Sequence, residues 1–234
     1  MTNKLNPKKI KDRIMQICHD TGAGHAASAM SCVNVLVDLY NNWDDEIIIL
    51  SKGHGVLAQY VILNELGKLP DEVLDSYYKD GGLSGHATLM PEYGIYASTG
   101  SLGHGLGIGI GYAIANPNKK VAVVLGDGEL QEGSTLEALR IMQDLKINNL
   151  LPIVDVNDWQ GFKETRRGIV LFQYREYFSI KGEGFGDGIE NTLSSHYAKV
   201  DNDILREWQE NSAKIERARL DRIAEYEKKL KKQN

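Results

Sequence analysis

The chain has 234 residues, of which 42% are hydrophobic and 25% are charged, and its formal net charge is −5. A chain of this length and composition can bury a sizeable core as one globular domain. The acidic balance argues against a nucleic-acid partner, and the lysine-rich stretch 228–232 is typical of a helix end that complements the helix dipole. Cys18 and Cys32 provide neither a disulfide framework nor the spacing of a metal site.

No segment of the sequence has the character of a membrane anchor. The first residues lack the apolar core of a signal peptide, and the longest nearly apolar stretch, 105–115, is glycine-rich and too short to span a bilayer. We therefore expect a cytoplasmic protein without a membrane partner.

Helix and strand patterns alternate along the first two thirds of the chain. Apolar residues at helical spacing predict helices, and β-branched runs predict short strands. In chain order we predict helices over 7–19 and 29–40, a strand over 47–50, a helix over 56–66, a loop-rich stretch over 79–103, a glycine-containing helix over 106–115, a strand over 120–125, a helix over 135–146 and a strand over 150–156. This alternation predicts an α/β fold with a mostly parallel sheet flanked by helices.

The pattern weakens after residue 162. One strand is predicted over 169–174, a glycine-rich loop over 181–188, and one long charged helix over 203–232. We therefore expect a globular unit over 1–202 and a C-terminal helix over 203–234 that packs on it or extends from it.

Polar residues follow two of the predicted strands. Gly126-Asp127-Gly128 ends the strand over 120–125, and Asn157 ends the strand over 150–156. In a parallel sheet these two strand ends can place a carboxylate and an amide oxygen around a divalent cation at the point where a diphosphate would bind. Gly-Asp-Gly alone is more often a simple turn, but the second strand end favours the cation site.

Four of the six histidines directly follow a glycine, namely His25, His54, His86 and His104. One such histidine is more often a satisfied turn residue than a ligand. Four together indicate tight turns that line a polar ligand at the strand ends of an α/β sheet.

Two segments, 126–133 (GDGELQEG) and 154–160 (VDVNDWQ), resemble the thiamine-diphosphate signature of transketolases. Other motifs similar to those of the family lie at 24–25, 50–55 (LSKGHG), 85–86, 97–105 (ASTGSLGHG), 180–184 and 195–197. The resemblance extends from about 8 to 201 and is weakest between 162 and 179.

The resemblance implies thiamine diphosphate and Mg²⁺ or Ca²⁺ as cofactors. It assigns the metal to Asp127, to the side-chain oxygen of Asn157 and to the backbone carbonyl of Trp159, with diphosphate oxygens and water completing the shell. The further cofactor-binding residues that it implies are His54, Gly100, Ser101, Leu102, Gly126, Gly128 and Glu129.

The histidines implied to be catalytic are His25, His86 and His196, which in the family line the substrate channel, bind substrate oxygens and move protons. His104 stands where the family more usually has glutamine, so we expect it to pack or donate a hydrogen bond. Glu132 and Glu137 resemble family glutamates of a buried network at the subunit interface. Glu137 also fits a helix capping box that starts at Ser134, and neither alternative makes it the catalytic acid.

The family places the glutamate that activates the cofactor in a second, pyrimidine-binding domain, which this sequence does not contain. The resemblance therefore implies that the partner is a separate C-terminal subunit, in an α₂β₂ assembly that acts on a sugar or sugar phosphate. It also implies that one βα unit is missing between 162 and 180. Two alternatives remain: a component of another thiamine-diphosphate enzyme, related to deoxyxylulose-phosphate synthase or 2-oxoacid dehydrogenases, and a non-catalytic scaffold. The histidine set favours transketolase over both.

Overall fold

The computed structural model describes residues 4–161, 163–165, 174–179, 196 and 198–230. Up to residue 156, the predicted helices and strands are present in the predicted order, and the short helix α4 was not predicted. The bounds of the helices and strands are α1 Pro7–Thr21, α2 Ala26–Asn42, β1 Ile47–Leu50, α3 Val56–Glu65, α4 Asp71–Leu74, α5 Gly105–Ala115, β2 Val121–Gly126, α6 Gly133–Asp144, β3 Leu150–Val156, β4 Arg175–Phe178 and α7 Asn202–Leu230. Short 3-10 turns lie at Gly53–Gly55, Pro91–Tyr93 and Asp127–Gln131.

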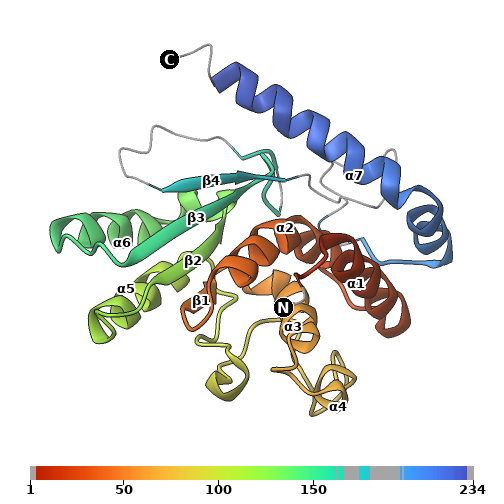
Figure 1. The fold of residues 1–234 in the computed structure, drawn as a ribbon, viewed down its shortest axis with the longest axis horizontal. Coiled ribbons are helices and arrows are strands. Elements are labelled where there is room, and N and C mark those ends of the chain that lie inside the picture. Colours follow the sequence, from red (N-terminus) through yellow and green to blue (C-terminus); the bar gives the residue numbers. More distant parts are fainter. Residues whose placement is uncertain (1–3, 162, 166–173, 180–195, 197, 231–234) are drawn as a thin grey trace.

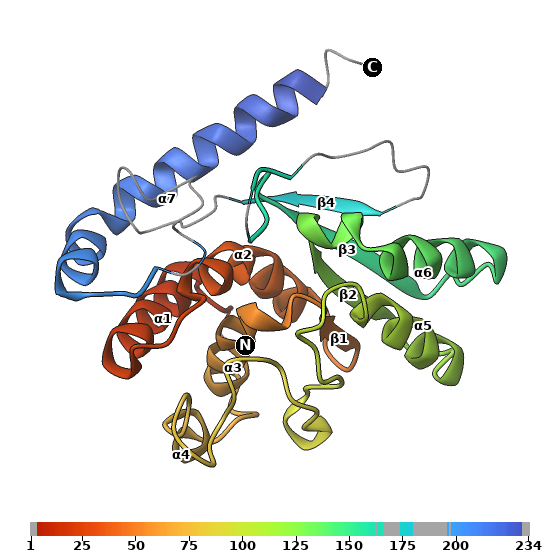
Figure 2. The same cartoon turned by 180° about the vertical axis from the view of Figure 1, so that it is seen from behind.

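The described strands form one sheet in the order β1-β2-β3-β4, and every neighbouring pair is parallel. Side chains of β1 and β2 alternate between the two faces. Ile48, Leu50 and Val124 pack in the cluster that includes α1, α2 and α3, whereas Ile49 and Val123 pack with α5 and α6. Figures 1 and 2 show these two helical layers on opposite faces of the sheet. The predicted α/β fold is confirmed, and covering on both faces explains why these strands are apolar throughout.

The fourth strand, β4, was not predicted, and the strand predicted over 169–174 falls largely on residues that the structure does not describe, so it stays a prediction. β4 begins at Arg175 and pairs with Ile153–Val156. β4 is the edge of the described sheet, where one side is not paired, so its side chains can be polar and hydrophobicity does not mark it. The expected loss of one βα unit falls largely on segments that are not described, and it stays a prediction.

The long C-terminal helix is confirmed as α7. Its first turns pack on α1, where the Trp208 side chain is 2% exposed and its Nε1 donates to Oδ1 of Asp12 at 2.9 Å. From there α7 projects past the body of the domain (Figure 2). No helix in the described residues is both long and apolar enough to cross a membrane.

Candidate active site

The carboxyl ends of β2 and β3 meet at one cavity. Gly126 lies opposite Asp155 in the sheet register, so Asp127 and Asn157 leave neighbouring strands at nearly the same level. Both line a cavity of about 60 Å³. A wider cleft of about 460 Å³ adjoins it. The two share His54, Leu102, Gly128, Gln160, Gly161 and His196.

Backbone hydrogen bonds hold Asp127 toward the end of β3. Its Oδ2 accepts from the amide of Asn157 at 3.2 Å and from the amide of Asp158 at 2.7 Å, and the residue is 1% exposed. Burial raises the pKa of Asp127 to about 7, and the nearby carboxylate of Asp155 adds to the rise. A cation beside this carboxylate would offset the cost of burying its charge.

The oxygens at the two strand ends suit a hard cation. Asn157 Oδ1 already accepts from the amide of Trp159 at 3.0 Å, which fixes the orientation of the side chain. Among the described residues, no group of three or more His, Cys, Asp or Glu side chains could hold a metal. A cation at Asp127 therefore needs amide, carbonyl and ligand oxygens to complete its shell, which is the donor set that Mg²⁺ and Ca²⁺ accept.

The turn after β2 leaves little room for side chains. A Cβ atom added to Gly128 would lie 3.0 Å from the Cβ of Gln160. Gly128 therefore lets the backbone lie close to the cavity, as a diphosphate site requires. Together with the donor set, this fits the predicted metal and thiamine diphosphate.

Four of the predicted histidines come together in the wider cleft. The ring centroid of His25 lies 5.6 Å from that of His54, 5.5 Å from His86 and 5.4 Å from His196. Burial lowers the pKa of His25, with His86 as a second cause, and burial followed by Lys52 lowers the pKa of His54 well below its usual range. These two imidazoles are therefore neutral near pH 7 and can both donate and accept hydrogen bonds.

Unusual backbone conformations at His25 and Gly100 help to bring the histidines of this cluster together. His25 has a φ of +63°, an uncommon conformation for a residue with a side chain. Gly100 has a φ of +151°, and a Cβ there would lie 2.8 Å from Cδ2 of His86. Gly100 and Leu102 line the cleft, whereas Ser101 on the same loop is exposed and lines neither space.

Glu129, which was predicted to bind the cofactor, lines the cavity but is engaged by its own loops. Its carboxylate accepts from Ser51 Oγ at 2.6 Å and from the amides of Gly103 and Gly126, each at 2.8 Å. These bonds tie the loop before α5 to the ends of β1 and β2. The structure therefore gives Glu129 a role in holding the loops together.

The capping box predicted at Ser134 and Glu137 is wrong. α6 begins at Gly133, after Glu132, and no side chain caps it, because Ser134 already lies within the first turn. Glu137 is exposed in a groove of about 480 Å³ between α5 and α6, which His104 also lines. Glu132 lies at the rim of the wider cleft.

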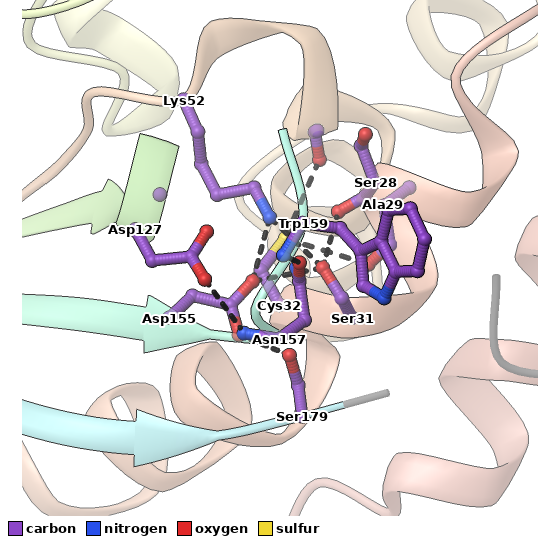
Figure 3. Close-up of polar contacts among 12 residues, drawn as sticks. Ser28, Ala29, Ser31, Cys32, Lys52, Asp127, Asp155, Asn157, Trp159 and Ser179 are labelled. Carbon is purple, nitrogen blue, oxygen red and sulfur yellow. Dashed lines mark hydrogen bonds and ion pairs between the residues drawn. The ribbon is translucent and has the colours of Figure 1, made fainter. Parts of the chain in front are cut away.

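Sequence reasoning missed a buried polar network beneath the cavity, shown in Figure 3. Lys52 Nζ lies 2.6 Å from Asp155 Oδ2, and Ser31 Oγ donates to the same oxygen at 2.8 Å. Ser179 Oγ donates to the other oxygen of Asp155. The available signal was the carboxylate itself, because a charge inside an apolar central strand requires a buried partner.

Comparison with known proteins shows the family to which the chain belongs. Residues 3–178 match the family described as 1-deoxy-D-xylulose-5-phosphate synthase. The chain is 35% identical over 212 residues to an apulose-4-phosphate transketolase subunit from Phocaeicola vulgatus, a match over 82% of this chain and 75% of that protein. It is 35% identical over 170 residues to the protein of the same name from Actinobacillus succinogenes, over 65% of this chain and 62% of that protein.

The fold also has close counterparts among solved structures. The transketolase of Campylobacter jejuni matches with a TM-score of 0.78 at 17% identity, over 88% of this chain and 42% of that chain. This chain thus spans less than half of the Campylobacter transketolase, whereas it spans 75% of the Phocaeicola subunit. The identity to that subunit over most of its length shows that the chain belongs to the transketolase family of thiamine-diphosphate-dependent proteins, as a relative of transketolases that are divided into subunits.

Proposed function

We propose that this chain is the diphosphate-binding subunit of an enzyme that transfers a two-carbon ketol unit from a ketose, or ketose phosphate, to an aldose-type acceptor. The observation that carries the proposal is the meeting of Asp127 and Asn157 at a cavity that adjoins a cleft lined by histidines. The relatives named for apulose-4-phosphate support a sugar phosphate as the substrate.

Thiamine diphosphate, when bound, supplies the nucleophilic carbon that such a transfer requires. Asp127, the Asn157 side chain and the carbonyl of Trp159 would hold the divalent cation. His25, His86 and His196 would bind the substrate oxygens. Because His25 is neutral near pH 7, its imidazole can donate to a carbonyl oxygen and accept a proton from a hydroxyl group at the same substrate.

The surface of α5 and α6 supports a partner subunit. α5 is apolar around its whole circumference, which is typical of a helix that is covered on all sides. Yet Ile114 is 58% exposed on α5, and Ile141 is 41% and Leu136 39% exposed on α6. Leu145, just after α6, is 58% exposed. Ile141 lines the groove between α5 and α6, together with Ile108, Ile110 and Glu137. We call the lining of this groove the α5/α6 surface, and an exposed apolar surface of this kind marks a protein interface.

The α5/α6 surface lies beside the active site, because Gly103 lines its groove and neighbouring Leu102 lines the catalytic cleft. A protein bound there would reach the cleft and cover Glu132 and Glu137. We therefore place the pyrimidine-binding partner on this surface, in an α₂β₂ assembly in which the partner supplies the glutamate that activates the cofactor.

Cofactor binding tests the site, and reconstitution tests the partner. Asp127→Ala is expected to weaken Mg²⁺-dependent thiamine-diphosphate binding at least 100-fold, measured by calorimetry with the partner present, whereas the exposed control Asp144→Ala binds normally. Unchanged binding by Asp127→Ala would refute the cofactor assignment. Ketol transfer by this chain alone would refute the requirement for a partner.

A second candidate function is favoured by the family match over residues 3–178, which points to a component similar to 1-deoxy-D-xylulose-5-phosphate synthase. That reaction takes a 2-oxo acid as donor and releases carbon dioxide, whereas ketol transfer releases a shortened aldose. A donor panel on the reconstituted pair separates them. Cofactor binding without turnover of any donor would support a non-catalytic scaffold.

A further inference from the structure

One buried cation lies at the proposed cofactor cavity. Lys52 is 3% exposed, and its Nζ donates to Asp155 Oδ2 at 2.6 Å and to Ser31 Oγ at 2.8 Å. Asp155 is fully buried in β3, two residues before Asn157. Figure 3 shows Lys52 reaching from the end of β1 to this carboxylate, close to Asp127.

The Lys52–Asp155 pair is fixed in place from several elements. Ser31 on α2 bonds both members of the pair, and Ser179, which follows β4, donates to the second oxygen of Asp155. Each partner is held by neighbours that belong to the core. The ammonium group therefore has little freedom to leave when a ligand enters the cavity.

Lys52 is also the only lysine or arginine among the described residues that line the cavity. Its charge lies at the cation site, because Lys52, Asp127 and Asn157 line the same cavity, and there it partly cancels the charge of Asp155, which acts more strongly on Asp127. Burial disfavours the charge of Lys52, but interactions led by the ion pair with Asp155 outweigh burial and raise its pKa. A charged ammonium therefore persists beside the predicted metal ligands.

Such a charge has opposite effects on the two components of the cofactor. It repels a divalent cation that enters alone and attracts a diphosphate, and the low polarizability of a buried site strengthens both effects. A cation that arrives with a diphosphate brings enough negative charge to offset the repulsion.

We propose that Lys52 is a fixed cation that makes binding of the divalent metal at Asp127 and Asn157 depend on the diphosphate. Asp155 is the positioning residue that holds Lys52 there and balances its charge. This inference rests on the proposed cofactor site and adds to it an order of loading, in which the metal enters with the anion.

The test measures binding of Mn²⁺ alone to the full chain by electron paramagnetic resonance. Lys52→Met is expected to bind free Mn²⁺ about tenfold more tightly than the wild type, because a repelling charge is lost, and to bind inorganic diphosphate about tenfold more weakly. Lys52→Arg keeps the charge and is expected to behave like the wild type. Asp155→Asn is expected to weaken Mn²⁺ binding.

The opposite signs separate this proposal from a purely structural role. If the pair only supports the fold, Lys52→Met and Asp155→Asn both weaken Mn²⁺ binding, and that result overturns the proposal. The matched control is Lys119→Met, which removes a lysine from the exposed ion pair with Asp45 and is expected to change nothing.

Lys52→Met leaves Asp155 as an unpaired buried charge, so circular dichroism must accompany the measurement. If that variant does not fold, the comparison becomes Lys52→Met/Asp155→Asn against Asp155→Asn. Tighter Mn²⁺ binding by the double variant supports the proposal, and equal or weaker binding overturns it. If the wild-type chain reconstituted with its partner binds no Mn²⁺ even with thiamine diphosphate, the proposed function itself fails. If the wild type binds but the variants shift together, only the role of Lys52 fails.

Discussion

The raised pKa of Asp127 makes the stability of the chain depend on pH in a way that one substitution removes. Its carboxyl group has a pKa of about 7 in the folded chain against an ordinary value of 3.8, chiefly because it is buried and also because Asp155 lies nearby. Since the folded state holds this proton more tightly, the unfolded state ionises first as the pH rises. The folded state therefore loses stability between about pH 4 and pH 7.

The size of the effect follows from the two pKa values. One pKa unit corresponds to about 1.4 kcal/mol, so the carboxylate costs about 4 kcal/mol of folding free energy once the pH exceeds 7, and nothing below pH 4. Asp127→Asn keeps the shape of the side chain and cannot ionise. The free energy of unfolding of the wild type relative to Asp127→Asn is thus expected to fall by about 4 kcal/mol from pH 4 to pH 7.5.

Urea unfolding followed by circular dichroism across this pH range measures the difference. The comparison with Asp127→Asn removes the contributions of other titrating groups, which both proteins share. Mg²⁺ with thiamine diphosphate should restore stability to the wild type above pH 7, because the cation favours the ionised carboxylate. A difference that stays flat with pH to within 1 kcal/mol, or that grows in favour of the wild type, would refute this account of Asp127.

Three further substitutions test other parts of the structure. Gly100→Ala should destabilise the chain by about 1–3 kcal/mol and displace His86, raising KM in the reconstituted enzyme, because the added Cβ would lie 2.8 Å from that ring. Gly107→Ala on α5, where a Cβ meets no neighbour, is the control and should stabilise the chain by about 0.5–1 kcal/mol in urea unfolding. Trp208→Phe should lower the free energy of unfolding by about 1–2 kcal/mol, because it removes the hydrogen bond from Trp208 Nε1 on α7 to Asp12. An unchanged urea midpoint would contradict that contact. Ile141→Glu, at a side chain that is 41% exposed and lines the groove, should change the free energy of unfolding by no more than about 1 kcal/mol and weaken association with the partner at least tenfold in analytical ultracentrifugation. Leu220→Glu, at another exposed apolar side chain, should associate normally, and equal behaviour of the two variants would exclude the α5/α6 surface as the interface.

The sequence predicted the elements with strong periodicity and missed what depends on the edge of the sheet. Runs such as Ile47–Leu50 are apolar because helices cover both faces, so their pattern is strong and local. β4 pairs on one side only in the described sheet, and its residues Arg175–Phe178 mix charge with aromatic side chains. Nothing in that short run distinguishes it from a loop until β3 is in place beside it.

The candidate site likewise contains some residues that could be predicted from the sequence and others that could not. Asp127 and Asn157 could be predicted because each directly follows a recognisable strand, and parallel strands bring their ends together. The ion pair of Lys52 and Asp155 joins residues far apart in the sequence, and it depends on the register of β3 against β2 as well as on the position of α2. The false capping box at Ser134 shows the opposite error, in which a correct local motif is overruled because the helix begins at Gly133, two residues before the start that the box requires.

The three buried carboxylates around the cavity show which of them is left for a cation. Glu129 accepts three hydrogen bonds from its own loops, and Asp155 has Lys52 and two serine hydroxyls. Burial raises the pKa of Glu129 and of Asp127, the latter to about 7, but Asp127 accepts only two amide hydrogens from described residues, both on Oδ2. The fold has thus satisfied two of the charges internally and left the third at the strand end, where a divalent cation arriving with a diphosphate would complete it.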